Sequence, residues 1–184
     1  MAIFSMNYTG SSILNKISSG EFLSVAILGD QVFATKYKSN MVNVYSYSGN
    51  KWSKTRSFKA STNNNERLTM SVKNNRIKCC SWDDDNIRVY TLTGQLLQTN
   101  STEGSGDAGQ LSDPFICDED EDGSVLFADQ YNDRLQVMTE EGKFSLLQLQ
   151  PPVEEPKSAA LFNNHLYVTS SKWMDATICK YTLG

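Results

Sequence analysis

Carboxylates gather in one short stretch of this 184-residue chain. The run 118–123 reads Asp-Glu-Asp-Glu-Asp-Gly and is followed by Asp129. This spacing matches the calcium loop of an EF-hand, with candidate ligands at Asp118, Asp120, Asp122 and Asp129. An EF-hand requires a helix on each side, whereas both flanks here have the apolar runs of strands. We therefore expect an acidic hairpin turn with no metal, and keep calcium binding as a minor alternative.

The sequence contains no motif that is typical of nucleophilic or metal catalysis. A zinc site takes three or four ligands, and the cysteines form no CxxC pair: Cys79, Cys80, Cys117 and Cys179. His165, the one histidine, follows two asparagines in an expected hairpin turn. There is no GxSxG sequence for a serine nucleophile. We expect no enzyme activity and no cofactor, and keep an enzymatic function as a lesser alternative.

Basic and aromatic residues alternate between positions 36 and 59, where no acid falls between Asp30 and Glu66. Basic side chains contact phosphates and aromatic rings stack on bases, so this patch is the candidate surface for RNA. Its basic members are Lys36, Lys38, Lys51, Lys54, Arg56 and Lys59. The plainer interpretation is the solvated outer edge of a sheet, where lysine also discourages pairing with another strand.

Charge is unevenly distributed along the chain. Residues 1–92 carry 12 Lys and Arg against 6 Asp and Glu, a balance of +6, whereas residues 93–184 carry 5 against 15, a balance of −10. Two oppositely charged faces or sides are expected. No secretory signal and no apolar run of 18 residues is present. We predict reduced thiols, a cytoplasmic location and no membrane partner.

A short pattern recurs along the chain: an apolar strand, a polar gap, a second strand and usually a turn. Its copies begin at Val42, Ile87, Leu135 and Ile178, so the intervals are 45, 48 and 43 residues. A period of this length is typical of propeller blades. Gly and Asn turns between runs of β-branched and aromatic residues favour hairpins. We predict an all-β chain with a lead-in or closing strand at 1–20 and four blade units, at 21–62, 63–109, 110–152 and 153–184.

The third unit resembles an NHL repeat, the propeller blade at the C-terminal end of many tripartite-motif ubiquitin ligases. The matching elements are Pro114, Asp122-Gly123, Val125 to Asp129, Asn132, Arg134 to Val137, and Gly142. The other units keep the strand spacing but differ at the Ala-Asp position, with Ala34-Thr35, Cys80-Ser81 and Val168-Thr169. The resemblance implies a non-catalytic module that selects substrates for ubiquitination. The chain has no RING-type Cys/His array for ligase chemistry.

Two residues of this pattern have an expected structural role. Asp129, at a strand end, can accept hydrogen bonds from the connecting loop, and Arg134 can pair with it across that loop. Such a pair would fix the loop without being strong evidence for added stability.

NHL propellers are commonly six-bladed, and four units cannot close such a ring. The hypotheses are a piece of a larger propeller, a compact four-bladed ring, or a homodimer that shares one ring; we favour the first. The predicted partner is a protein, including a ubiquitination substrate, with RNA as the alternative. Contact residues are expected in the loops between strands, namely Tyr37, Lys38, Asn40, Trp82, Asp84, Tyr131, Asn132 and Trp173.

Overall fold

The computed structural model describes residues 2–6, 13–63, 66–82, 85–100, 102–103, 106–172 and 175–182. Regular structure in these ranges is strand, apart from the single 3-10 turn η1 (Gln130–Asn132). The predicted all-β class is therefore confirmed. No described helix is long and apolar enough to cross a membrane.

Four antiparallel sheets follow one another along the chain, each with its strands in sequence order. The first contains β3 (Phe22–Leu28), β4 (Gln31–Lys36), β5 (Met41–Ser48) and β6 (Lys51–Lys59). The second contains β7 (Leu68–Lys73), β8 (Arg76–Ser81), β9 (Ile87–Thr91) and β10 (Leu96–Asn100). The third contains β13 (Pro114–Glu119), β14 (Val125–Asp129), β15 (Arg134–Met138) and β16 (Phe144–Leu147). The fourth has β17 (Pro156–Phe162), β18 (His165–Lys172) and β19 (Asp175–Thr182).

The tight turns form where the sequence supplies residues that tolerate a positive φ. Gly49 and Asn50, between β5 and β6, have φ values of 56° and 62°. Asn74 and Asn75 do the same between β7 and β8, at 49° and 57°. Both pairs suit the two-residue hairpin turn, which requires left-handed backbone at both central positions. The turn residues therefore fix where each sheet folds back.

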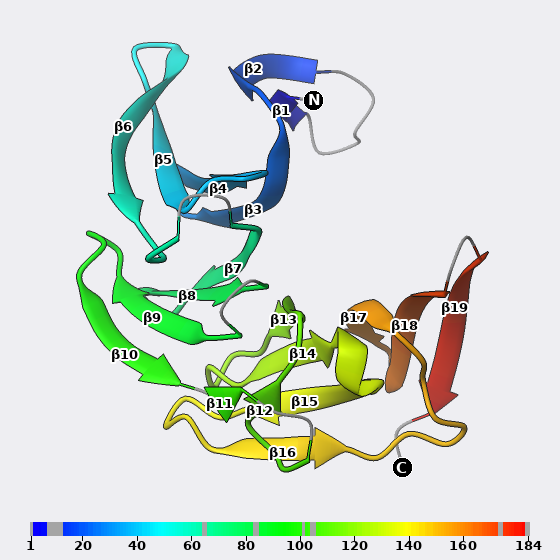
Figure 1. Cartoon of the computed structure of the whole chain (residues 1–184). Helices are drawn as coiled ribbons and strands as arrows, with labels where there is room; N and C mark the ends of the chain where they lie inside the picture. Colours follow the sequence, from blue (N-terminus) through cyan, green and yellow to red (C-terminus); the bar gives the residue numbers. More distant parts are fainter. Residues whose placement is uncertain are drawn as a thin grey trace.

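Figure 1 shows the four sheets arranged as blades about a common axis, with the first strand of each blade innermost. Apolar side chains fill the spaces between neighbouring blades. Phe33 and Ile77 belong to the cluster between the first and second blades, and Phe127 and Ile87 to that between the second and third. Leu135 and Val168 lie between the third and fourth. Each blade is thus stabilised mainly by its neighbours, as in other repeat architectures.

The first twenty residues include a hairpin of β1 (Ala2–Met6) and β2 (Ile13–Ser19), which pair antiparallel. Ile3 and Ile17 pack with Phe22 and Tyr45 on the face of the first blade that points away from the second. The lead-in therefore covers the first blade and adds no strand to the fourth, whose described sheet has three strands.

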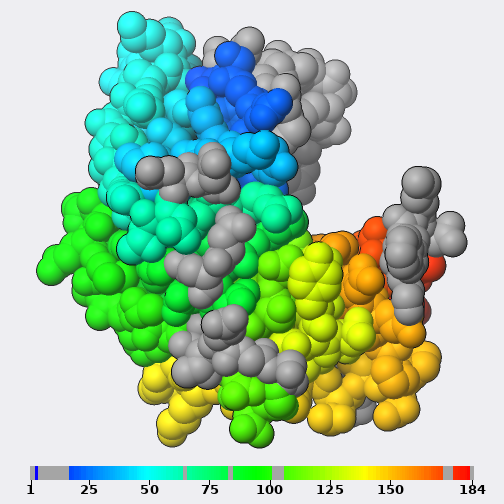
Figure 2. All heavy atoms as spheres, viewed as in Figure 1, coloured from blue at the N-terminus to red at the C-terminus, as the bar shows by residue number. Residues whose placement is uncertain are grey.

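The blades form an open arc. The described apolar clusters join the first blade to the second, the second to the third and the third to the fourth. In the space-filling view, the coloured atoms of the first blade (blue to cyan) and of the fourth (orange to red) do not meet (Figure 2). A closed four-bladed ring, one of the three arrangements considered from the sequence, is therefore not formed by the described residues.

Candidate functional site

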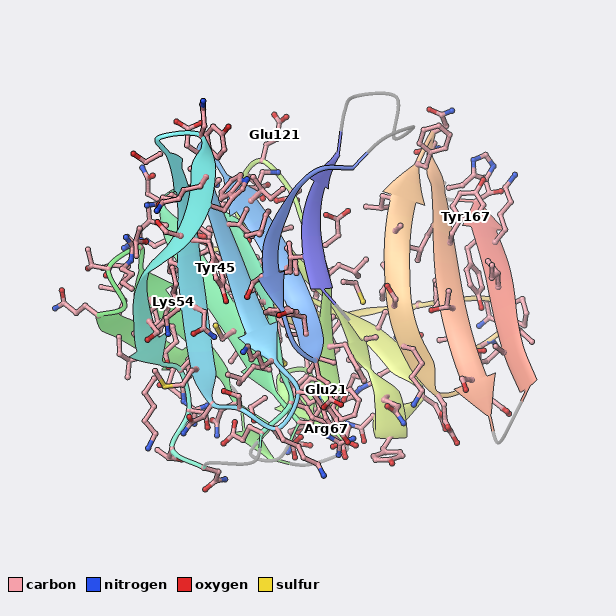
Figure 3. All side chains as sticks on the ribbon, turned by 90° about the horizontal axis from the view of Figure 1, so that it is seen from above. Glu21, Tyr45, Lys54, Arg67, Glu121 and Tyr167 are labelled. Atoms are coloured by element: carbon pink, nitrogen blue, oxygen red, sulfur yellow. The ribbon has the colours of Figure 1, made fainter. Side chains whose placement is uncertain are left out.

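One end of the arc gathers two kinds of connection: the loops between second and third strands, and the segments that lead into the innermost strands. We call this the loop end. The same backbone hydrogen bond ties the two together in successive blades. The N–H of Tyr37 donates to the Glu21 carbonyl at 2.8 Å, and that of Trp82 to the Arg67 carbonyl at 3.4 Å. Figure 3 shows Glu21 and Arg67 at this same end, with Glu121 at the opposite end, which we call the turn end.

An aromatic and cationic stack lies at the loop end between the second and third blades. The Trp82 and Phe115 rings meet edge to face with their centroids 4.2 Å apart. The Arg67 guanidinium carbon lies 4.0 Å from the Trp82 centroid. Aromatic pairs of this geometry and a cation over an indole are both attractive, because the ring face is electronegative and its edge electropositive. The indole Nε1 is buried without a hydrogen-bond acceptor.

Charged residues of both signs surround this stack. Burial lowers the pKa of Lys157, and the Arg67 guanidinium acts in the same direction, whereas the carboxylates of Glu155 and Asp113 oppose the shift. Lys157 lies on β17, the innermost strand of the fourth blade. Residues that lead into or lie on the inner strands of three blades therefore share one electrostatic environment at the loop end.

Two tyrosines extend the surface of the loop end into solvent. Tyr131 is 62% exposed and belongs to η1, which directly follows β14. Its N–H is held by the Ser112 carbonyl at 3.3 Å, so the turn is fixed while the ring is free to make contacts. Tyr37 is 42% exposed, and the Lys38 ammonium lies 5.5 Å from its ring centroid. These side chains are available to a partner.

Three polar side chains join each loop to the segment that enters the next blade. The Asn40 amide donates to the Ser61 carbonyl at 3.4 Å. Asp85 accepts from the N–H of Asp113 at 2.9 Å, and Asp133 accepts from the N–H of Glu155 at 2.7 Å. These residues hold consecutive blades in register.

Asp129 is the most heavily bonded carboxylate of the third blade, and it is fully buried. It accepts from the Ser112 N–H at 2.7 Å, from Arg134 Nε at 2.8 Å and from Gln136 Nε2 at 2.8 Å. The Asn132 amide donates to both of its oxygens. Arg134 also donates to the carbonyls of the incoming loop at Gly106, Asp107 and Gln110. This network positions η1 and therefore Tyr131.

The predicted contact residues thus fall into three groups. Tyr37, Lys38 and Tyr131 are exposed at the loop end. Asn40, Asn132 and Trp82 are occupied in contacts within the protein. Asp84 and Trp173 lie outside the described residues.

The basic patch of the sequence divides between two places. Lys51, Lys54 and Lys59 are exposed on β6, the outermost strand of the first blade, where Figure 3 labels Lys54. Arg56, on the same strand, donates to Gln31 Oε1 at 3.2 Å and to the Leu92 carbonyl at 2.8 Å. The other two basic residues, Lys36 and Lys38, lie at the loop end.

The aromatic residues of this segment are also divided. Tyr45 is buried, and its hydroxyl donates to Ser18 Oγ at 3.2 Å. Tyr47 pairs with Trp52, with their ring centroids 5.4 Å apart. The tertiary structure therefore does not bring the segment 36–59 together into one basic and aromatic surface.

The four candidate calcium ligands are not brought together either. Asp120 and Asp122 lie in the hairpin turn between β13 and β14, where both accept from the Ser124 N–H, at 2.8 and 3.0 Å. Asp129 ends the five-residue strand β14 at the loop end. Since a strand rises roughly 3.3 Å per residue, about 15 Å of strand separates Asp129 from the turn. The EF-hand alternative is therefore wrong, because its flanks are strands and its twelfth position points elsewhere.

No group of three or more His, Cys, Asp or Glu side chains suited to a metal occurs among the described residues. Burial raises the pKa of the Cys79 thiol to about 12, and that of Cys117 to about 12 as well. A thiol is nucleophilic only as the thiolate, so these two cysteines are inert near neutral pH.

Sequence reasoning missed three members of the loop end: Arg67, Phe115 and Lys157. They lie in or just before the innermost strands, whereas the predicted contact residues belong to the loops between second and third strands. A signal was present, because a charged residue directly precedes the inner strand in all four blades, at Glu21, Arg67, Asp113 and Glu155. Aligning the blades from these positions would have found Arg67, whereas Phe115 and Lys157 are each the second residue of their inner strand.

Comparison with solved structures identifies the architecture. A protein of unknown function from Bacteroides thetaiotaomicron has a TM-score of 0.69 at 14% identity, over 93% of this chain and 50% of that one. The virginiamycin B lyase of Staphylococcus aureus has a TM-score of 0.59 at 15% identity, over 89% of this chain and 56% of that one. Both neighbours are β-propellers. The chain has the β-propeller fold.

A computationally designed protein is also similar, with a TM-score of 0.62 at 14% identity over 90% of this chain and 92% of that one. The propeller chain thus spans about half the length of the two natural proteins and nearly all of the designed one. No protein-family model and no curated protein sequence matches it. At these identities the likeness concerns the fold alone.

Proposed function

We propose that this propeller is a non-catalytic recognition module that holds a protein partner at its loop end. The observation that carries the proposal is the cluster of Tyr131, Tyr37 and the Arg67–Trp82–Phe115 stack on one end of the arc. Tyr, Trp and Arg are enriched at protein interfaces and dominate their binding energy. The tyrosines supply exposed area, and the stack supplies a rigid support for it.

The charges favour a protein over a polyanion at this end. Arg67 and Lys157 lie among the carboxylates of Asp113 and Glu155, so the surface is mixed in sign. A nucleic acid would require neutralisation of many phosphates by a predominantly basic surface. A polypeptide can match alternating charges through hydrogen bonds around an aromatic centre.

We further propose that the partner is a substrate presented for ubiquitination in the cytoplasm, in the manner of the NHL propellers of tripartite-motif ligases. The support is the third-blade pattern, in which Asp129, Asn132 and Arg134 together order the loop that carries Tyr131. The absence of disulfides among the cysteines agrees with a reducing compartment.

The proposal is tested by affinity capture from cell extract, with proteins identified by mass spectrometry. Tyr131→Ser should abolish capture of the specific partner, because it removes an exposed anchor without touching the Asp129 network. Tyr47→Ser is the matched control, since Tyr47 is 44% exposed at the turn end. Equal capture by the wild type and by both variants would refute the proposal, as would the absence of any specific partner.

RNA binding is the second candidate, favoured by the exposed lysines of β6, Lys51, Lys54 and Lys59. Filter binding of single-stranded RNA across a salt series tests it. If this strand contacts phosphates, affinity should fall steeply as salt rises. Lys54→Gln should weaken binding and make the salt dependence shallower, whereas Tyr131→Ser should have no effect.

A further inference from the structure

A partly enclosed cavity lies between the third and fourth blades, away from the loop end. Its volume is about 130 Å³. The third blade contributes walls from all four of its strands, β13 to β16, and the fourth from β17 and β18. The lining residues are Asp118, Asp120, Ser124, Leu126, Val137, Leu147, Leu161 and Leu166.

Five of these side chains are aliphatic and come from both blades, so the interior of the cavity is apolar. Leu126 and Leu166 are buried at its base, whereas Leu161 is 52% exposed. A cavity of about 150 Å³ with similar apolar walls stays dry and holds a benzene molecule. This cavity therefore has room for one branched aliphatic side chain.

The rim of the cavity is acidic and fixed in place. The Ser124 N–H donates to Asp120 and Asp122, and the Glu119 N–H donates to Asp118 at 2.8 Å. Burial raises the pKa of Asp120, and hydrogen bonding to Asp122 acts in the same direction. A cation that approached this rim would relieve the repulsion between neighbouring carboxylates.

Among the described residues, the nearby lysines bond to Glu119 and its surroundings, and no ion pair joins either of them to Asp118 or Asp120. Lys73 Nζ donates to the Glu119 carbonyl at 3.0 Å. Lys78 Nζ lies in a cage formed by Glu119, Glu140 and the Gly123 carbonyl. The run 118–122 carries five consecutive carboxylates. The carboxylates of Asp118 and Asp120 at the rim can therefore still receive a cation from another molecule.

We propose that this cavity is a second binding site, which receives an aliphatic side chain of a protein partner flanked by a lysine or arginine. The aliphatic group fills the space between Leu126, Leu161 and Leu166. The adjacent cation lies against Asp118 and Asp120 at the rim. The site is separate from the loop end, so the test of this proposal does not depend on the proposed function.

Three small probes of one shape and different charge test the proposal: isopentylamine, isopentanol and isovalerate. Each is titrated into methyl-labelled protein and followed by NMR. Isopentylamine should shift the methyl signals of Leu126 and Leu166, and should bind about fivefold more tightly than isopentanol, the factor expected for an exposed ion pair. Isovalerate should bind most weakly, because its carboxylate meets Asp118 and Asp120.

Two variants assign the two parts of the site. Asp120→Asn should remove most of the advantage of isopentylamine over isopentanol and leave isopentanol binding unchanged. Leu161→Trp should fill the cavity and abolish binding of all three probes, whereas Phe162→Ser, 66% exposed in the wild type and next along the strand, is the control and should change nothing. Equal affinity for amine and acid, methyl shifts elsewhere, or no shift at millimolar probe would overturn the proposal.

Discussion

At the scale of single residues, buried charges in this propeller are satisfied by several partners at once. Asp129 accepts from four residues and Lys78 donates to three. Leaving the water is costly for an ion, and that cost is offset only when its hydrogen-bonding capacity is filled. Removing such a residue therefore harms the protein mainly by leaving its partner buried and unpaired.

Asp129→Ala should lower the free energy of unfolding by about 3–5 kcal/mol, the usual cost of removing one member of a buried ion pair. Arg134, whose side chain is 15% exposed, would lose its carboxylate partner. Urea denaturation measures the effect, with Asp30→Ala in an exposed turn as the control, for which a change within about 0.5 kcal/mol is expected. Similar midpoints for the two variants would contradict this account.

At the scale of elements, each blade depends on turns that only certain residues can form. Gly94 has a φ of +92°, and a Cβ built there would lie 2.4 Å from Phe58 Cγ, in the neighbouring blade. Gly49 has a φ of +56° and no atom within 4 Å of the position of such a Cβ. The two glycines share a positive φ but differ in steric crowding. Substituting each of them therefore separates the cost of backbone strain from the cost of a clash with Phe58.

Gly94→Ala should therefore destabilise the protein more than Gly49→Ala. A left-handed alanine costs about 1–3 kcal/mol at either site, and crowding against Phe58 adds about 1–3 kcal/mol at the first. Thermal unfolding followed by far-UV circular dichroism compares the two variants. If Gly49→Ala proved equally harmful, the close approach of Gly94 to Phe58 would not be what requires glycine there.

At the scale of the whole molecule, stability rests on contacts between successive blades. The Lys78 side chain of the second blade is 1% exposed and reaches Glu119 and Glu140 of the third, at 2.7 and 2.9 Å. It is a charged link between the basic and the acidic half of the chain. Because each blade contacts mainly its neighbours, such a link governs whether the two halves unfold together.

Lys78→Met should destabilise the protein by about 3–5 kcal/mol, since Glu119 would stay buried without its cation. The loss of coupling should also broaden the urea transition. Comparing tryptophan fluorescence with far-UV circular dichroism in a Trp173→Phe background reveals this, because the two remaining tryptophans, Trp52 and Trp82, lie in the first two blades. Lys54→Met, on the exposed face of β6, is the control. Coincident, sharp transitions in both variants would show that the link contributes nothing.

The spacing of Val42, Ile87, Leu135 and Ile178 was enough to predict the all-β propeller fold, because each blade is a local unit whose strands pair with their neighbours in sequence. The same locality made the sheet boundaries accessible: the sheets formed by β3–β6, β7–β10, β13–β16 and β17–β19 each fall within one predicted unit. The loop residues could also be placed from the sequence, because each loop joins two neighbouring strands of one blade. The sequence did not indicate which of their side chains are exposed.

Only the tertiary structure decided what lies between blades. Arg67, Trp82 and Phe115 meet across the boundary between two blades, and the cavity beside Leu161 forms from two sheets whose walls are distant in sequence. The acidic run that resembled a calcium loop became a hairpin rim, because β14 carries Asp129 to the opposite end. Periodicity determines how a blade folds by itself, but the packing of one blade on the next determines which side chains share a site.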